Sequence, residues 1–430
     1  MKDGGRLSAA IEVLEEVESR HRPVQNALKD WGTAHRFAGS GDRTVIGNLV
    51  FDALRHKASL ASRVGSDSPR LLALATYALT WENGLERLET VLSEDQHAPE
   101  VLSEAERTSL AAGSDREAEG AAAADVPDWL WPSFLEVFGE NAVAEGQALA
   151  ARAPIDLRVN TLKSDREKLL KRLSHVGAVP CPLSPVGMRI APKPGAARMP
   201  HVQAEEGYRK GWFELQDEAS QLVSLLAGPE PGMQVLDYCA GGGGKTLALA
   251  ARMENRGQIY AYDADRLRLA PIHERLQRAG ARNVQVRDPK SAGLDGLADE
   301  MDLVFVDAPC TGTGVWRRRP DSKWRLSEKA LADRIEDQRK VLVHASQYVK
   351  PGGRIAYVTC SLLPGENAEQ VTWFLSQNTE FSPVSALETW RARLPGADEP
   401  AYANDRGDIT LTPATTRTDG FFLALMERTG

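Results

Sequence analysis

Short runs of β-branched and aromatic residues recur along the second half of the chain, and helical patterns lie between them. The runs are QVLDYC, QIYAYD, NVQVRD, DLVFVDAP and RIAYVTC, between residues 234 and 360. Strands that alternate with helices form a parallel sheet with helices on both faces. We therefore predict a Rossmann-like α/β domain over residues 229–430, with the last apolar run, GFFLALMER, added at the sheet edge.

Three further regions precede this domain. Apolar residues at helical spacing predict an all-helical domain over residues 1–88. Residues 89–126 are rich in Glu, Ala, Ser and Asp without apolar periodicity, which predicts an acidic linker. Residues 127–228 mix short strand and helix patterns, as in a small α+β subdomain.

Charge and cysteine content narrow the class of protein. Residues 89–128 carry eleven acidic and two basic side chains, a balance of −9 that leaves +1 for the rest of a chain whose net charge is −8. A neutral body of this kind is compatible with a basic, nucleic-acid-binding face.

No apolar run approaches the roughly 20 residues of a membrane span, and no secretory signal is visible. No pair of cysteines has metal-ligand spacing, so we expect no metal site. We expect a cytoplasmic protein, taken to be a monomer, whose four thiols are free: Cys181, Cys239, Cys310 and Cys360.

A glycine-rich turn, DYCAGGGGKT, joins the first predicted strand of the sheet to a helix over residues 237–246. Four successive glycines remove every Cβ where backbone must approach a ligand. A P-loop would need glycine where Cys239 stands, and a dinucleotide fingerprint counted from Gly241 would need glycine at Thr246. S-adenosylmethionine remains as the predicted ligand, and a tight turn without a ligand is the structural alternative.

Two acids end the next two predicted strands. Asp263 follows QIYAY at the position where a carboxylate accepts hydrogen bonds from the ribose hydroxyls of a nucleoside ligand. Asp288 ends the third strand, where it could meet an adenine amino group or simply cap a helix.

The motif Asp307-Ala-Pro-Cys310 ends the fourth strand and runs directly into TGTGVWRRRPDSKWR. Ligands of open α/β sheets lie beyond the carboxyl ends of the strands, so an acid and a thiol should face the site. The arginines and lysine that follow, interleaved with Trp316 and Trp324, form a pattern typical of nucleic-acid binding. A solvated basic face is the alternative interpretation.

A second thiol, Cys360, ends the fifth strand in the run YVTCS. If strand order brings the tips together, both thiols line one pocket with Asp307. Cytosine C5 becomes nucleophilic when a thiolate adds to C6, an acid near N3 neutralises charge, and a base must later remove the C5 proton. Two thiols and an acid fit this chemistry, whereas methylation of an amino group needs no covalent step.

The motifs DYCAGGGGKT, DAPCTGTGVWRRRPDSKW and YVTCS, in this order, resemble the Fmu/Sun (RsmB-type) and NOL1/NOP2 RNA cytosine-5 methyltransferases. RVNTLK, FELQDEAS and DGFFLA resemble other parts of that family, so the resemblance covers residues 127–430. The N-terminal helices resemble the NusB-like RNA-binding domain of the bacterial 16S rRNA enzymes. The family usually has proline where Gly243 stands and a small residue where Pro289 stands, which implies a more mobile loop and a weaker adenine contact.

The resemblance implies a role for each site residue. Cys360 would be the nucleophile, Cys310 would assist product release, and Asp307 would contact the base near the cofactor. S-adenosyl-L-methionine would be held by Cys239, Ala240, Gly241, Gly242, Gly243, Gly244, Lys245, Asp263, Asp288 and Asp307. RNA, expected to be 16S ribosomal RNA, would meet Arg158, Arg317, Arg318 and Lys323.

Other functions also fit parts of the sequence. An RNA-binding or ribosome-assembly factor with an inactive methylase domain would not need intact thiols. The substrate could also be tRNA or DNA. In a DNA cytosine-5 enzyme the thiol after proline, Cys310, would be the nucleophile, and Cys360 would be redundant.

Overall fold

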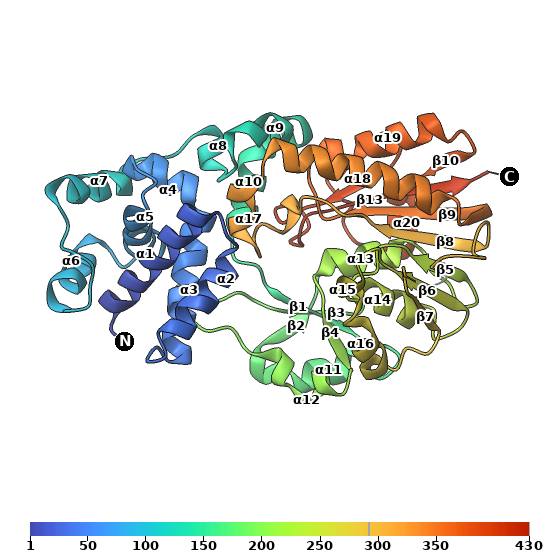
Figure 1. Ribbon diagram of the computed structural model, residues 1–430, viewed down its shortest axis with the longest axis horizontal. Helices are drawn as coiled ribbons and strands as arrows, with labels where there is room; N and C mark the ends of the chain where they lie inside the picture. Colours follow the sequence, from blue (N-terminus) through green and yellow to red (C-terminus); the bar gives the residue numbers. More distant parts are fainter. Residues whose placement is uncertain (291–292, 430) are drawn as a thin grey trace. The chain divides into compact units, whose positions relative to one another are not determined.

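The computed structural model describes residues 1–290 and 293–429 and divides into two compact units (Figure 1). The helical unit comprises Met1–Arg152, Pro192–Met199 and Trp316–Leu326. The sheet unit comprises Ala153–Ala191, Pro200–Val315 and Ser327–Gly430. No helix in the described ranges is long and apolar enough to cross a membrane.

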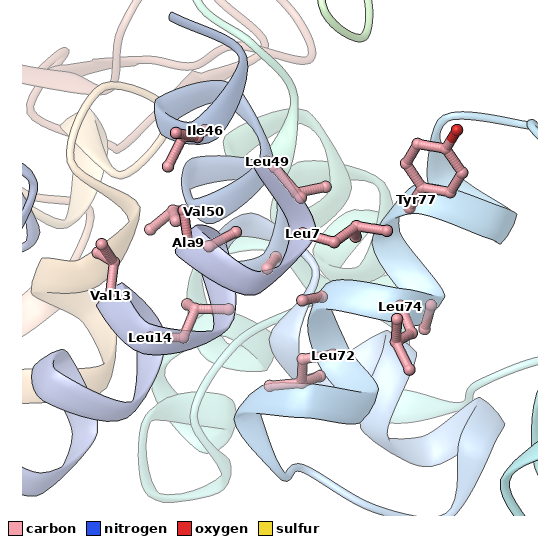
Figure 2. Packing of buried hydrophobic residues seen from close by; sticks show 14 of the residues in the cluster. Leu7, Ala9, Val13, Leu14, Ile46, Leu49, Val50, Leu72, Leu74 and Tyr77 are labelled. Atoms are coloured by element: carbon pink, nitrogen blue, oxygen red, sulfur yellow. The ribbon is translucent and has the colours of Figure 1, made fainter. Parts of the chain in front are cut away.

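The helical unit forms around one apolar core. Leu7 and Val13 of α1, Leu49 of α3 and Leu74 of α5 are buried together (Figure 2). Ser68 caps α5 by accepting a hydrogen bond from the Leu71 N–H, and Pro69 begins that helix. The first helices are α1 (Asp3–Arg20), α2 (Val24–Ala34), α3 (Ser40–Arg55), α4 (Lys57–Val64) and α5 (Pro69–Ala75), followed by a π-helical turn at Thr76–Thr80. The predicted helical N-terminal region is therefore confirmed.

The prediction of a structureless acidic linker over residues 89–126 is wrong. Helices form within it because a few leucines reach the core: Leu92 and Leu110 are buried against the helices before them. Ser103 and Glu106 make a reciprocal capping box at the start of a helix. The helices of this part are α6 (Leu85–Glu94), α7 (Glu104–Asp115), α8 (Gly120–Ala123), α9 (Trp131–Phe138) and α10 (Ala142–Ala150), with 3-10 turns at Asp128–Leu130 and Gly139–Asn141.

A short piece of the predicted α/β domain, residues 316–326, belongs to the helical unit. Helix α17 (Pro320–Arg325) carries Lys323, whose side chain is 1% exposed. Its Nζ donates to the carbonyl oxygens of Arg55 and Asp125, each at 2.8 Å, and the Trp324 indole donates to the Leu54 carbonyl at 2.6 Å. Helix α17 is thus joined to the end of α3 and to Asp125 through backbone acceptors.

We expect Lys323→Ala to lower the free energy of unfolding by about 2–4 kcal/mol, because two buried carbonyls lose their donor and a cavity opens.

Burial lowers the pKa of Lys323 to about 8, against 10.5 for an ordinary lysine. Between these values the unfolded chain holds one more proton than the folded chain, so this lysine makes stability rise with pH. The Lys323→Met variant keeps a side chain of similar length in this buried position but has no group that titrates. Its stability relative to the unsubstituted chain should fall from pH 7 to pH 10 in urea unfolding, and a constant difference would contradict this assignment.

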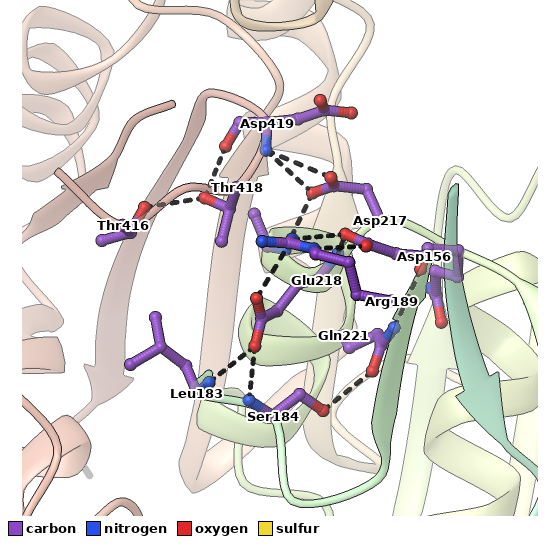
Figure 3. Close-up of polar contacts among 12 residues, drawn as sticks. Asp156, Leu183, Ser184, Arg189, Asp217, Glu218, Gln221, Thr416, Thr418 and Asp419 are labelled. Carbon is purple, nitrogen blue, oxygen red and sulfur yellow. Dashed lines mark hydrogen bonds and ion pairs between the residues drawn. The ribbon is translucent and has the colours of Figure 1, made fainter. Parts of the chain in front are cut away.

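The sheet unit begins with a four-stranded antiparallel sheet in the order β2-β3-β1-β4. Arg189 of β3 pairs with Asp156 of β1 at 2.7 Å, and Asp156 also accepts from the backbone N–H of Glu218, the first residue of α13 (Figure 3). Asp217 in turn accepts from the Asp419 N–H just before β13. The elements are β1 (Ile155–Val159), α11 (Arg166–Arg172), β2 (Ala178–Pro180), β3 (Gly187–Ile190), α12 (Glu206–Arg209), β4 (Phe213–Leu215) and α13 (Glu218–Leu226), with 3-10 turns at Ser174–Val176 and Val202–Ala204.

The large sheet has the order β11-β12-β13-β9-β8-β5-β6-β7, and β10 also pairs with β13. The strands of the five predicted runs are parallel, as expected. They are β5 (Gln234–Asp237), β6 (Gln258–Tyr262), β7 (Val284–Arg287), β8 (Met301–Asp307) and β9 (Val349–Thr359). The remaining strands are β10 (Phe381–Val384), β11 (Tyr402–Ala403), β12 (Ile409–Leu411) and β13 (Phe421–Arg428). The Rossmann-like fold is confirmed.

The expected edge position of the last strand is wrong. β13 lies antiparallel between β9 and β12. Residues 421–426 are buried on both faces, which is why this run is apolar throughout rather than alternating.

Helices cover both faces of the large sheet. Leu222 of α13, Leu249 of α14 and Trp390 of α20 share one core with the strands. Leu342 of α18 and Phe374 of α19 pack on the opposite face. The helices are α14 (Gly244–Arg252), α15 (Arg266–Leu269), α16 (Ile272–Ala279), α18 (Glu328–Ser346), α19 (Ala368–Gln377) and α20 (Ala386–Arg393), with 3-10 turns at Thr313–Val315 and Pro364–Glu366.

Candidate active site

The glycine-rich turn lies between β5 and α14 and is fastened to the end of β6. The Ala240 N–H donates to the Tyr262 carbonyl at 2.8 Å, and the Gly241 N–H donates to Asp263 Oδ2 at 2.9 Å. Asp263 is buried, and its other oxygen accepts from the Asp265 N–H. The structure therefore brings together the glycine turn and the first predicted acid. Asp288 lies half-buried after β7, 3.5 Å from Arg266.

Gly243 has a φ of +80°, and a Cβ there would lie 2.5 Å from Ile272 Cγ1. Proline fixes φ near −65°, so proline could not occupy this position. The expectation that this loop has lost a proline at Gly243 is therefore wrong. Glycine is required here by the backbone and by the packing of α16, which argues for a fixed turn rather than a mobile one.

The two thiols that end β8 and β9 lie together. These strands are parallel neighbours, with Asp307 opposite Val358 in the register. Cys310 follows β8 and Cys360 follows β9, and their sulfur atoms are 3.3 Å apart, within hydrogen-bonding distance. Cys181 is buried beside β3, and its pKa is raised by burial, as for a structural thiol.

Lys245 on α14 reaches the acid of the same site. Its Nζ lies 2.7 Å from Asp307 Oδ2 and 5.1 Å from the centre of the Phe421 ring. Burial alone lowers the pKa of Lys245, but the Asp307 carboxylate and the charge of a Cys360 thiolate leave that pKa raised. Lys245 therefore interacts both with the Asp307 carboxylate and with a charge on Cys360.

Cys310 has the opposite surroundings. The hydrogen bond to Cys360, burial, and the nearby charges of Cys360, Glu366 and Asp307 together hold the pKa of Cys310 well above its usual value. Lys245 thus interacts with a charge on Cys360, and Glu366 and Asp307 interact with a charge on Cys310. The spacing of the motifs does not provide this distinction.

Residues that sequence reasoning missed lie directly behind the thiols. Glu366 is fully buried and accepts hydrogen bonds from Thr311, Gln338 and Ser361. Nothing in the run SLLPGENAEQ marks this acid as buried, because acids in Pro-Gly turns are normally solvated.

The predicted RNA-binding cations are divided between the two units. Arg317 and Lys323 are buried in the helical unit, Arg318 is half-buried there, and Trp316 stacks on Phe134 with ring centres 5.8 Å apart. We predicted that Lys323 contacts RNA and that Trp316 stacks on a base. Both predictions are wrong, because both side chains are buried.

Arg158 belongs to the sheet unit and is 4% exposed on β1. It lines a pocket of about 370 Å³ with residues of α13 and α14, none of which belongs to the thiol site. Burial lowers its pKa to about 10.

Comparison with known proteins places the chain in a family. Residues 224–427 match the family model for 16S rRNA methyltransferase RsmB/F, and residues 126–194 match the RsmF/B-like ferredoxin-like domain. The chain is 31% identical over 313 residues to a protein named probable ribosomal RNA small subunit methyltransferase B from Synechocystis sp.. The chain belongs to the RsmB/F methyltransferase family. The match covers 70% of this chain and 66% of the relative, so the chain spans slightly less than two thirds of that protein.

Solved structures extend the likeness of this RsmB/F family member. The crystal structure of PH0851 is 25% identical with a TM-score of 0.72, and the match covers 100% of this chain and 99% of that one. A methyltransferase homologue from Pyrococcus horikoshii is 27% identical with a TM-score of 0.59, over 72% of this chain and 97% of the other. Helical and sheet units of this kind therefore occur together in another solved chain.

The cofactor of this methyltransferase family is S-adenosyl-L-methionine, and the residues present fit it. The Asp263 carboxylate has lone pairs left for ribose hydroxyls, since each oxygen accepts one backbone N–H. The glycines at 241 and 243 keep side chains out of the turn, and a Cβ at Gly241 would lie 3.8 Å from Asp263 Oδ2. No group of three or more His, Cys, Asp or Glu side chains suited to a metal ion is found among residues 1–290 and 293–429.

Proposed function

We propose that this chain transfers a methyl group from S-adenosylmethionine to C5 of a cytosine in RNA, through a covalent bond between Cys360 and C6. The observation that carries the proposal is the pair of sulfur atoms 3.3 Å apart beside the Lys245–Asp307 pair. Relatives named as ribosomal RNA small subunit methyltransferase B support small-subunit ribosomal RNA as the substrate.

The first step is addition of the Cys360 thiolate to C6. The thiol proton leaves to water, and the Lys245 ammonium stabilises the resulting thiolate. As the S–C6 bond forms, the electron pair of the C5–C6 double bond shifts toward N3. The proton held between Lys245 and Asp307, 2.7 Å apart, neutralises that charge through the carboxylate.

The second step uses the nucleophilic C5. Bound S-adenosylmethionine supplies an electrophilic methyl group. Asp263 and the glycine turn would hold the donor and thereby fix its position relative to the thiols. Parallel strands β6, β5, β8 and β9 present all these groups at one edge of the sheet.

Release reverses the addition. Water accepts the C5 proton, the C5–C6 double bond forms again, and the C6–S bond breaks with its electron pair on the Cys360 sulfur. The proton on N3 returns to the Lys245–Asp307 pair. Cys310 in its thiol form donates a hydrogen bond to that sulfur across 3.3 Å. The raised pKa of Cys310 favours this donor role over the role of base.

The test is transfer of labelled methyl from S-adenosylmethionine to small-subunit ribosomal RNA, followed by nucleoside mass spectrometry. We expect 5-methylcytidine at a single position. Substrates of tRNA and DNA in parallel reactions distinguish the nucleic-acid classes. Label in another nucleoside would contradict the thiol chemistry, and binding without any label would indicate an assembly factor.

A further inference from the structure

Glu366, at the end of the 3-10 turn Pro364–Glu366, is fully buried behind the two thiols. Its Oε1 accepts from the Thr311 N–H at 2.8 Å and from Gln338 Nε2 at 3.0 Å. Its Oε2 accepts from the hydroxyls of Thr311 and Ser361. Four donors converge on two oxygens, which is the pattern expected around an ionised carboxylate even though burial raises the pKa of Glu366.

The donors are the immediate neighbours of the thiols. Thr311 follows Cys310, and Ser361 follows Cys360. Gln338 on α18 also donates to the Pro309 carbonyl at 2.9 Å, so the residues on both sides of Cys310 are joined to the same carboxylate. One buried acid therefore fixes the loop after β8 against the loop after β9.

The backbone of Glu366 is fixed as well. The Tyr357 hydroxyl donates to the Glu366 carbonyl at 2.7 Å from within β9. The Asn367 side-chain amide donates to the Ser361 carbonyl at 2.9 Å, and its oxygen accepts from the Thr359 hydroxyl at 2.6 Å. The carboxylate thus has a rigid base from which to hold the thiol loops.

The charge of Glu366 acts on the Cys310 thiol. The groups acting on Cys310 are the Cys360 sulfur from the end of β9, the Asp307 carboxylate from β8 and Glu366 from its own turn; the buried Tyr357 hydroxyl of β9 is also close enough to interact. Cys360 interacts with the ammonium group of Lys245 from α14. A negative charge in this position disfavours a thiolate at Cys310.

We propose that Glu366 is a positioning residue for both thiols: through Thr311, Ser361 and Gln338 it holds Cys310 against Cys360. The role in release rests on the proposed function. The effect of its charge on Cys310 belongs to the free protein and is testable without RNA, whereas the holding role is tested through turnover on RNA.

The first test measures alkylation of each cysteine by iodoacetamide against pH in the RNA-free protein, by peptide mass spectrometry. We expect Glu366→Gln to lower the midpoint for Cys310 by roughly one pH unit, because a like charge is lost. Glu369→Gln, which neutralises an exposed acid one turn away, is the control and should leave the midpoint unchanged. Equal midpoints in Glu366→Gln and the unsubstituted protein would overturn the proposed charge effect.

The second test separates holding from charge by comparing methyl transfer in a single turnover with steady-state turnover on RNA. Glu366→Asp keeps the charge but shortens the reach. We expect single-turnover transfer within about threefold of normal and steady-state turnover reduced roughly 10- to 100-fold, since release is the step that needs Cys310. Equal losses in both rates would overturn a role in release.

Folding is checked by thermal unfolding of each variant. If the Glu366 variants do not fold, Gln338→Leu removes only the link from Glu366 to the Pro309 carbonyl and should give the same split between the two rates. If the unsubstituted protein methylates no RNA, the proposed function fails. The alkylation midpoints still decide the effect of Glu366 on Cys310.

Discussion

Cys310→Ala is expected to trap the protein on its RNA as a covalent adduct that survives denaturation, whereas Cys360→Ala should form none. Attack at C6 needs only the Cys360 thiolate and the Lys245–Asp307 pair, which the first variant retains. Release then lacks the hydrogen bond that the Cys310 thiol donates across 3.3 Å. Methylated RNA should therefore accumulate in the bound form, with steady-state turnover reduced by roughly 10²- to 10⁴-fold.

Denaturing gel electrophoresis with labelled RNA and S-adenosylmethionine measures the adduct directly. Cys181→Ala is a matched control, because that buried thiol lies outside the site and should support turnover without an adduct. The double variant with both site cysteines replaced should show no adduct. An adduct in Cys360→Ala instead would make Cys310 the nucleophile, as expected for a DNA-type mechanism.

The placement of the thiols was predictable because parallel strands end at a common edge. Asp307, Cys310 and Cys360 each follow an apolar strand run, so their shared edge follows from the strand pattern alone. Contact between the thiols depends in addition on strand order. β8 and β9 are direct neighbours, and this adjacency comes from the tertiary structure.

Composition misled the prediction where a few apolar residues decide the structure. The acidic stretch folds because Leu92 and Leu110 reach a core formed by distant helices. Lys323 and Trp316 occur in a basic, aromatic run that is typical of RNA-binding segments. Their burial depends on acceptors and rings contributed by residues far away in sequence, such as Arg55 and Phe134.

Glu366 could not be found from local pattern for a similar reason. A carboxylate is stable in the interior only when donors converge on it, and its donors come from three separate segments. The pairing of Lys245 with Asp307 likewise joins a helix to a strand 62 residues away in sequence. Sequence motifs therefore predicted the candidate reacting groups, whereas the structure shows the charged groups that surround them.

Lys245 is one of these charged groups. Its ammonium group lies 2.7 Å from Asp307 and interacts with a Cys360 thiolate, while the Phe421 ring lies 5.1 Å from its nitrogen. Methionine has a similar length and no charge. The Lys245→Met variant therefore removes the cation while largely preserving the packing of α14 against the sheet.

We expect Lys245→Met to slow the single-turnover rate at saturating S-adenosylmethionine by roughly 10²- to 10³-fold, because thiolate formation and protonation through Asp307 both lose their cation. Calorimetric titration of S-adenosylmethionine provides the comparison that separates chemistry from binding. Lys340→Met, on the exposed side of α18 beside Glu336, is the charge-matched control and should be near normal. A Lys245→Met rate that recovers fully at saturating cofactor would assign this lysine to cofactor binding alone. A loss that persists at saturation, with the Cys310→Ala adduct forming more slowly in the double variant, places the cation in the attack of Cys360 on the base.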